Sequence, residues 1–323
     1  MPLPHSSRRS LLGAGAALAL PGLARAQGAF PNRPLRMLIP VGVGGVTDIV
    51  GRVMAEALQG ALGQPVVPEN LVGAGSRVGA AGFHRLPNDG YTVFIGTNNH
   101  PVMQAIDPNF PHHPIRDFEP ISLVAQQPFV LAVHPDVPAN DLPSLLTWLR
   151  AQGERANFGT AAPGATNYMA GALFQQLSGT SFTLVPYRTA AQAVADLLAG
   201  RMQLSIDSPT LMMPLIRDGR LRAIAVTSEG PSTLVPNLPP IATALPGYAL
   251  VAWQVLFLRP GAPEDAKRIL TETAARVLRD PATLEKLRGA NVEPWPDATP
   301  AAAARHVARE VEVWAPIAER IPR

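Results

Sequence analysis

The sequence of 323 residues contains no cysteine, which excludes a disulfide framework, a thiolate-ligated metal site and a cysteine nucleophile. Signatures of other enzymes are also missing: neither H-E-x-x-H nor G-x-S-x-G occurs, and the seven histidines show no metal-ligand spacing. No apolar run approaches the roughly 20 residues that a membrane-spanning helix needs. We therefore expect no metal, no cofactor and no catalysis, in a chain whose 47% apolar content can build a sizeable core.

The first 26 residues have the layout of an export signal. Arg8 and Arg9 precede an apolar stretch over 11–20, and the small-residue motif A-R-A follows at 24–26. The arginine pair resembles a twin-arginine signal, and a general secretory signal stays an alternative. Cleavage is predicted just before Gln27, which makes the mature chain a soluble protein of the periplasm.

Charge is balanced once this signal is set aside. The whole chain has 27 basic and 24 acidic residues, and the signal holds three arginines and no acid, which leaves 24 of each. We expect no nucleic-acid partner, and any attraction for an anionic ligand has to arise locally.

Short apolar runs alternate with helical periodicity along most of the chain. Strands are predicted over 35–40, from 66, and over 91–97, 130–133, 156–159, 183–187, 202–206, 222–227 and 250–259. Helices are predicted over 48–62, 79–86, 142–152, 168–177, 189–199, 263–279, 281–289 and 300–320. The alternation predicts an α/β protein of two units in series, each a mostly parallel sheet flanked by helices, and then a helical tail.

Two strand-to-helix loops are rich in small residues, 40–48 (PVGVGGVTD) and 160–167 (TAAPGATN). Free N–H groups at a helix start attract anions, and glycine lets the backbone approach a ligand. The alternative is a simple tight turn, with Thr47 or Asp48 as the helix cap. A third loop, 73–79, has the spacing G-x-G-x-x-x-G, one residue longer than a dinucleotide fingerprint, so nucleotide binding is not favoured.

In their order and spacing, several segments resemble the Bug family, the substrate-binding proteins of tripartite tricarboxylate transporters. The resemblance covers about residues 28–320. It rests on the segments 40–48 with Arg52, 70–79, 89–92 with 96–97, 185–188, 196–200, 219–227, and Trp253 followed by 259–263.

The resemblance implies a two-lobed periplasmic binding protein (type II-like) that closes on its ligand like a Venus flytrap. Lobe 1 is then expected over 27–127 plus 250–323 and lobe 2 over 128–249, with the chain passing between lobes near 125–130 and 248–253. The implied ligand is a small organic anion: a di- or tricarboxylate, an acidic amino acid or an aromatic carboxylate.

The resemblance also assigns candidate ligand-binding residues, none of them catalytic. The two loops are expected to grip a carboxylate through Gly44, Gly45, Thr47, Thr160, Gly164, Ala165 and Thr166. Val41 and Asn167, in the same two loops, are further candidates for ligand binding. The rest of the ligand is expected to meet Gly73, Ala74, Gly75, Thr97, Asn98 and Asp207. Asp48 is expected mainly to cap its helix. The chain departs from the family at Val41, where an aromatic residue is usual, at Asn167-Tyr168, where Ser-His is common, and at Arg188-Thr189, where Lys-Gly is usual.

The implied partners are the membrane subunits of the transporter (TctA- and TctB-like), served by a monomeric binding protein. Two other functions stay open at this point. A sensory module that docks to a receptor would use the same capture surface, and a secreted α/β enzyme acting on small anions would need a nucleophile or metal whose motif the sequence lacks.

Overall fold

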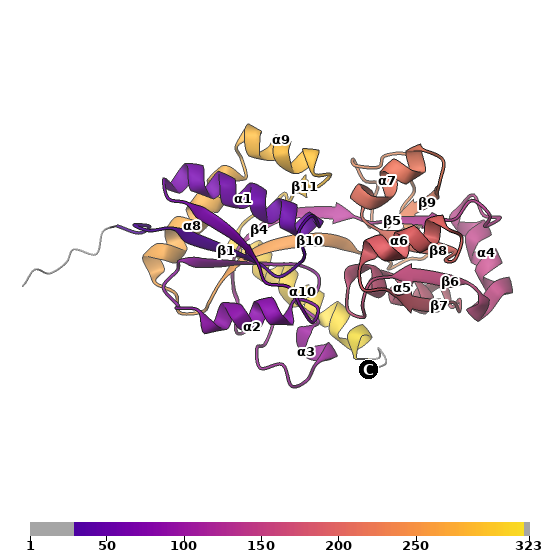
Figure 1. Ribbon diagram of the computed structural model, residues 1–323, viewed down its shortest axis with the longest axis horizontal. Coiled ribbons are helices and arrows are strands. Elements are labelled where there is room, and N and C mark those ends of the chain that lie inside the picture. Colours follow the sequence, from indigo (N-terminus) through magenta and orange to yellow (C-terminus); the bar gives the residue numbers. More distant parts are fainter. Residues whose placement is uncertain (1–28, 320–323) are drawn as a thin grey trace, which may run out of the picture.

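The computed structural model describes residues 29–319, and the predicted signal over 1–26 lies outside this part of the chain. Two β-sheets form the framework, one in each of two lobes that lie side by side in Figure 1. Lobe 1 carries the six-stranded sheet and lobe 2 the five-stranded sheet. The predicted two-lobed α/β architecture is confirmed.

Lobe 1 is built from both ends of the described chain, around a sheet of order β11-β4-β10-β3-β1-β2. Its first elements are β1 (Leu35–Ile39), α1 (Val46–Leu62), β2 (Val66–Asn70), α2 (Arg77–Arg85), β3 (Thr92–Gly96), α3 (Met103–Ile106) and β4 (Glu119–Pro128). Its last are β10 (Val251–Leu258), α8 (Glu264–Val277), α9 (Pro281–Gly289), β11 (Glu293–Pro294) and α10 (Pro300–Ala318).

Lobe 2 is formed by the middle of the chain, around a sheet of order β7-β6-β8-β5-β9. Its elements are β5 (Val130–Val133), α4 (Leu142–Gln152), η1 (Gly153–Arg155), β6 (Asn157–Thr160), α5 (Thr166–Ser178), β7 (Thr183–Pro186), α6 (Ala190–Leu198), β8 (Leu204–Asp207), α7 (Pro209–Arg217), β9 (Arg222–Val226) and η2 (Ile241–Thr243).

Both sheets are mixed, which corrects the prediction of mostly parallel sheets. β1 pairs parallel with β2 and β3, and β6 pairs parallel with β7 and β8. The two strands on which the chain enters a lobe, β5 and β10, run antiparallel to both of their neighbours. A strand that arrives from the other lobe begins at the edge where its neighbours end, so it has to run against them.

These passages bring the carboxyl ends of the parallel strands of both lobes to the interlobe boundary. β5 begins with Val130 paired to Asp207, the last residue of β8. β10 begins with Val251 paired to Pro128, the last residue of β4. Open α/β sheets bind ligands beyond the carboxyl ends of their strands, so the boundary between the lobes is where a site is expected.

Helix α1 anchors the loop that follows β1. Its buried side chains Val50, Met54 and Leu58 repeat every four residues and so form one face, which packs on β1 and against α8 and α9. Full burial of one such side chain stabilises the fold by about 1.5–3 kcal/mol. The start of α1 is therefore fixed relative to the sheet edge.

Helix α10 belongs to both lobes. Its residues Ala303 and Val307 pack in an apolar cluster of lobe 1, whereas Trp314 and Ala318 pack in the core cluster of lobe 2. Figure 1 shows the helix, in yellow, running from one lobe toward the other. The tail thus lies on lobe 1 except for its last turns, which join the core of lobe 2.

Candidate functional site

Most helix starts at the interlobe edge lack a side-chain cap; α6, which follows β7 at the same edge, is the exception and is capped by Thr189. The helices α4, α6, α9 and α10 begin with a side-chain oxygen that accepts from the backbone of the first turn. The helices α1, α2, α5 and α7, which follow β1, β2, β6 and β8, have no such side-chain bond. Since the first four N–H groups of a helix lack intrahelical partners, these starts keep donors for another acceptor.

Asp48 braces the loop before α1 from inside. Its side chain is 2% exposed, and its carboxylate accepts from the Gly44 N–H at 2.9 Å and from the Asn70 amide at 2.7 Å. The Arg52 guanidinium pairs with it at 3.0 Å. Burial alone would raise the pKa of Asp48, but the bonds from Arg52, Asn70 and Gly44 outweigh burial and hold the pKa below its usual value.

This network changes the expected roles in the first loop. The helix cap is Gly45, not Thr47 or Asp48, although Asp48 does satisfy a backbone donor just outside the helix, as a capping side chain would. The N–H of Gly44 is used by Asp48, so it is not among the donors left for a ligand. The side chain of Val41 packs against the lobe 1 core, and its carbonyl accepts from Asn70 at 3.0 Å.

A second network braces the corresponding loop of lobe 2. The Asn167 amide donates to Asp207 at 2.9 Å, and its oxygen accepts from the Ala161 N–H at 3.1 Å. The other carboxylate oxygen of Asp207 accepts from the Ser208 N–H at 2.7 Å. The structure thus brings together two of the predicted site residues, Asn167 and Asp207, and both are buried.

Asp207 differs from Asp48 in having no cation beside it. No lysine or arginine within the described residues forms an ion pair with Asp207, which is 4% exposed. Burial raises the pKa of Asp207 to about 6, although the bonds from Ser208 and Asn167 oppose the rise. Lobe 2 therefore holds its loop with a carboxylate whose charge is poorly compensated.

The hydroxyl groups of the two loops are engaged differently. Thr160 is fully buried and donates to the carbonyl of Ala161. Thr47 accepts a long bond of 3.5 Å from the Gln254 amide, which leaves its own proton free to donate. In this conformation Thr47 is thus the better donor for an anion.

The lobe 2 loop touches lobe 1 at Gly164. This residue has a left-handed backbone (φ +85°), and a Cβ built on it would overlap Cδ1 of Ile106 in α3. Glycine is required here because the two lobes approach each other through its bare backbone. Ala165 caps α5 and Thr166 is its first residue, so both lie at the same point of the boundary.

Residues after β3 tie lobe 1 to the passing strand β10. The Asn98 amide donates to the Val251 carbonyl at 2.8 Å, and its oxygen accepts from the Trp253 N–H at 3.0 Å. The carbonyl of Thr97, also buried, accepts from the His100 N–H at 2.7 Å. Asn98 therefore fixes the boundary between the lobes with both ends of its amide.

The loop after β2 is strained. Ala74 (φ 47°) and Ser76 (φ 72°) adopt the left-handed region, as do Gly73 and Gly75. A non-glycine residue costs about 1–2 kcal/mol there, and such strain is concentrated at functional sites. The loop is held by a bond of 3.3 Å from the Asn99 amide to the Ser76 hydroxyl.

Three residues near the site were not predicted from the sequence to be site residues: Gln254, Asn70 and Arg52. Gln254 is a fully buried polar residue in the apolar strand β10, and its oxygen has no partner within the described part of the chain. Its only sequence signal is its polarity within VAWQVLFL. Asn70 and Arg52 act through Asp48, and the spacing of four residues between Asp48 and Arg52 on a helix was the available signal.

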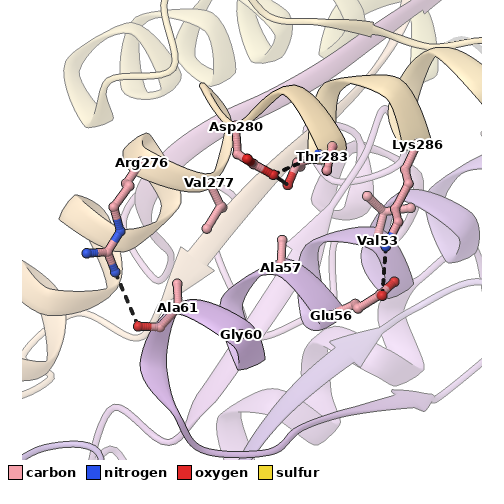
Figure 2. A pocket seen from close by; sticks show the side chains of 11 residues that line it. Val53, Glu56, Ala57, Gly60, Ala61, Arg276, Val277, Asp280, Thr283 and Lys286 are labelled. Carbon is pink, nitrogen blue, oxygen red and sulfur yellow. Dashed lines mark hydrogen bonds and ion pairs between the residues drawn. The ribbon is translucent and has the colours of Figure 1, made fainter.

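A groove of about 410 Å³ lies elsewhere, between α1 and the pair α8 and α9. Figure 2 shows that an ion pair between Glu56 and Lys286 (2.7 Å) and a bond from Arg276 to the Ala61 carbonyl cross it. Its lining on α1 runs from Val53 to Ala61, so no interlobe loop contributes to it. The groove is separate from the candidate site.

Within residues 29–319, no cluster of three or more His, Asp or Glu side chains could hold a metal ion. No helix in the same range is long and apolar enough to cross a membrane.

Comparison with known proteins gives a consistent answer. Residues 50–322 match the family model described as "Tripartite tricarboxylate transporter family receptor" (TctC). The chain is 30% identical to the protein BugT of Bordetella pertussis, over 88% of each chain. It resembles the solved structure of the periplasmic binding protein BugD (TM-score 0.79, 28% identity, 89% of this chain and 97% of that one). It also resembles R. palustris Rpa4515 with adipate (TM-score 0.80, 30% identity, 90% and 97%).

Proposed function

The chain belongs to the TctC family of tripartite tricarboxylate transporter receptors, and on that premise we propose how it holds its ligand. As a member of this family it is a periplasmic solute-binding protein for small carboxylates. The ligand is a carboxylate held at the boundary between the lobes, by the starts of α1 and α5. The similar protein Rpa4515 was solved with adipate, which favours a dicarboxylate here.

The observation that carries this proposal is the pair of uncapped helix starts that face the boundary from opposite lobes. Carboxylate oxygens accept from the N–H groups at the start of α1, from Gly45 to Thr47, and at the start of α5, at Thr166. The Ala165 N–H is not among these donors, because it donates to the Ala162 carbonyl at 2.9 Å. Each helix end acts as about half a positive charge, so neutral donors can hold the anion without a buried lysine or arginine. The Thr47 hydroxyl adds a donor.

The other predicted residues divide into two groups. Asp48, Asn98, Asn167 and Asp207 position the loops through the bonds described above, and Gly44 and Thr160 take part in the same internal bonding. The remaining residues, Val41, Gly73, Ala74, Gly75, Thr97 and Gly164, shape the space around the rest of the ligand.

Delivery is the purpose of capture in this family. The loaded protein, cleaved before Gln27 and monomeric, passes its ligand to TctA- and TctB-like membrane subunits. Closure of the lobes removes the ligand from water, because each lobe supplies one of the two helix starts.

A thermal-shift screen of residues 27–323 against small carboxylates tests the function. A ligand that binds only the folded state at 100 times its Kd stabilises it by about 2.7 kcal/mol, which raises Tm measurably. The function is refuted if no carboxylate shifts Tm while a non-acidic solute does.

Two single substitutions test the geometry with the ligand that the screen finds. Thr47→Val is expected to weaken binding about tenfold, the value of one hydrogen bond to a charged group. Thr160→Val is expected to weaken it less than threefold, because the Thr160 proton is already donated to Ala161. Thr147→Val, at an exposed position of α4, is the matched control. Equal losses for Thr47→Val and Thr160→Val would contradict the assignment.

A further inference from the structure

Exposed aliphatic side chains gather at the interlobe edge of lobe 1, on two loops and on the first turn of α2, which follows the second loop. Of the eight large hydrophobic side chains that are exposed within the described residues, four follow β1 or β2. They are Val43 (76% exposed), Leu71, Val72 (56%) and Val78. We call these four residues the aliphatic rim.

The two loops that carry the rim are packed together. The Leu71 N–H donates to the Ile39 carbonyl at 2.9 Å, so both loops leave the sheet side by side. A Cβ built on Gly79, next to Val78, would lie 2.6 Å from Cβ of Pro40. The rim is therefore one surface, and it adjoins the uncapped start of α1.

The rim is also rigid, and the charge nearest to it in the sequence is paired. Ion pairing of Arg77 with Asp107 (3.4 Å) and the bond from Asn99 to Ser76 hold the strained loop after β2 in place. The segments 40–47 and 70–76 contain no acidic or basic residue. Arg77, next to Val78, is 21% exposed and already paired with Asp107, so covering the rim mainly desolvates apolar surface and backbone, and such surface gains free energy when it leaves water.

Lobe 2 presents a matching uncharged surface. Its loop begins Ala161-Ala162-Pro163, and the contact of Gly164 with Ile106 shows that this loop reaches lobe 1. A ligand whose carboxylate sits at the start of α1 extends its body between these two loops.

We propose that the aliphatic rim is the subsite for the apolar body of the ligand, so that the protein prefers carboxylates with an aliphatic chain or an aromatic ring to hydroxylated carboxylates of equal length and charge. This inference rests on the proposed function. The inference adds a ligand class to the proposed function, because the rim recognises methylene groups and the helix starts recognise the carboxylate.

Calorimetric titration of residues 27–323 with straight-chain dicarboxylates measures the effect of the body at constant charge. From succinate to adipate, affinity is expected to rise about fourfold for each added methylene, the worth of one buried CH₂. Malate, which adds a hydroxyl to the succinate chain, is expected to bind no better than succinate.

The double variant Val72→Thr/Val78→Thr keeps the shape of the rim and makes it polar. It is expected to weaken adipate binding at least fivefold and to change succinate binding less than twofold. Val67→Thr, on β2 at 45% exposure but outside the loops, is the matched control and is expected to change neither.

Each contrary result has one meaning. If adipate binds no better than succinate, or if the double variant weakens both equally, the rim is not the body subsite and the carboxylate function stands. If Val67→Thr weakens adipate as much as the double variant does, the effect is not local and the inference fails. If no dicarboxylate or other carboxylate binds, the proposed function and the inference fail together.

Discussion

Asp207 offers a direct test of how the lobe 2 loop is built. Its pKa lies at about 6 in the folded protein, against an ordinary value of 3.8. At 1.36 kcal/mol per pH unit, this interval means that the ionised carboxylate costs the folded state about 3 kcal/mol. Above pH 6 the group is ionised in the folded and unfolded states, so the full cost applies. As the pH falls through 6, the folded state binds a proton before the unfolded state does, and the cost is relieved.

Asp207→Asn removes the charge and keeps the shape. It also leaves either the Asn167 amide or the Ser208 N–H without an acceptor, because asparagine has one oxygen where aspartate has two; this costs about 1–2 kcal/mol. At pH 8 the variant is therefore expected to be more stable than the parent by about 1–2 kcal/mol. Between pH 8 and pH 5 this advantage is expected to fall by roughly 1.5 kcal/mol, since about half of the 3 kcal/mol cost is relieved one pH unit below the folded-state pKa.

Urea unfolding of both proteins at pH 8 and pH 5, followed by tryptophan fluorescence, measures the difference. The difference between the two unfolding free energies at each pH removes the contribution of the titratable groups that both proteins share. These groups include His84 and His100, whose pKa burial lowers to about 4. Asp218→Asn is the control. It removes a carboxylate that is exposed to water, so it shows the effect of losing a charge that folding does not bury. If the free-energy difference between Asp207→Asn and the parent is the same at both pH values, the buried, uncompensated carboxylate is refuted.

Two further predictions concern the contacts between and beside the lobes. Gly164→Ala is expected to destabilise the protein by about 2–4 kcal/mol, from its left-handed backbone and its overlap with Ile106. In an Ile106→Ala background the same substitution should cost only the left-handed backbone, about 1–2 kcal/mol, and an equal cost in both backgrounds in thermal unfolding would contradict the contact. Trp253→Phe removes the indole donor, 2.7 Å from the buried Glu310 carboxylate, and is expected to cost about 2 kcal/mol at pH 8. Because burial raises the pKa of Glu310, the cost should be smaller at pH 5, and equal costs in urea unfolding would argue against an ionised partner.

The repeating βα segments could be predicted from sequence because their signals are local. The strand at 35–39 is a short apolar run, and α9 begins at Pro281 and ends at Gly289, as its proline and glycine indicate. The strand β4 could not be recognised in the same way. Its sequence EPISLVAQQP holds prolines and glutamines that break the alternation, and its pairing partner β10 lies more than a hundred residues away.

The mixed sheets were missed for a related reason. Strand direction depends on which lobe the chain arrives from, and neither β5 nor β10 carries that information in its own residues. The short helix α3 and the two-residue strand β11 have too few residues to show a period.

For the site, sequence located the loops but not the side-chain pairs that hold them. Small residues between a strand and a helix marked 40–48 and 160–167. The bond between Asn167 and Asp207 spans 40 residues, and the bond between Thr47 and Gln254 spans 207. These pairs join residues that are far apart in the sequence and that the strand order brings together. They can therefore be recognised only once the arrangement of the strands is known.

The position of α10 limits how the lobes can move. Two neighbouring strands by themselves act as a pliable ribbon that permits bending and twisting alike. Since α10 packs on those strands in lobe 1 and then enters the core of lobe 2, it is a third link between the lobes and opposes a twist of the two strands. A wider swing has to pull Trp314 out of the core or bend the helix near Pro316, where the backbone lacks an N–H. The rate of solute exchange is thereby coupled to the last turn of the helix, some distance from any group that touches the solute.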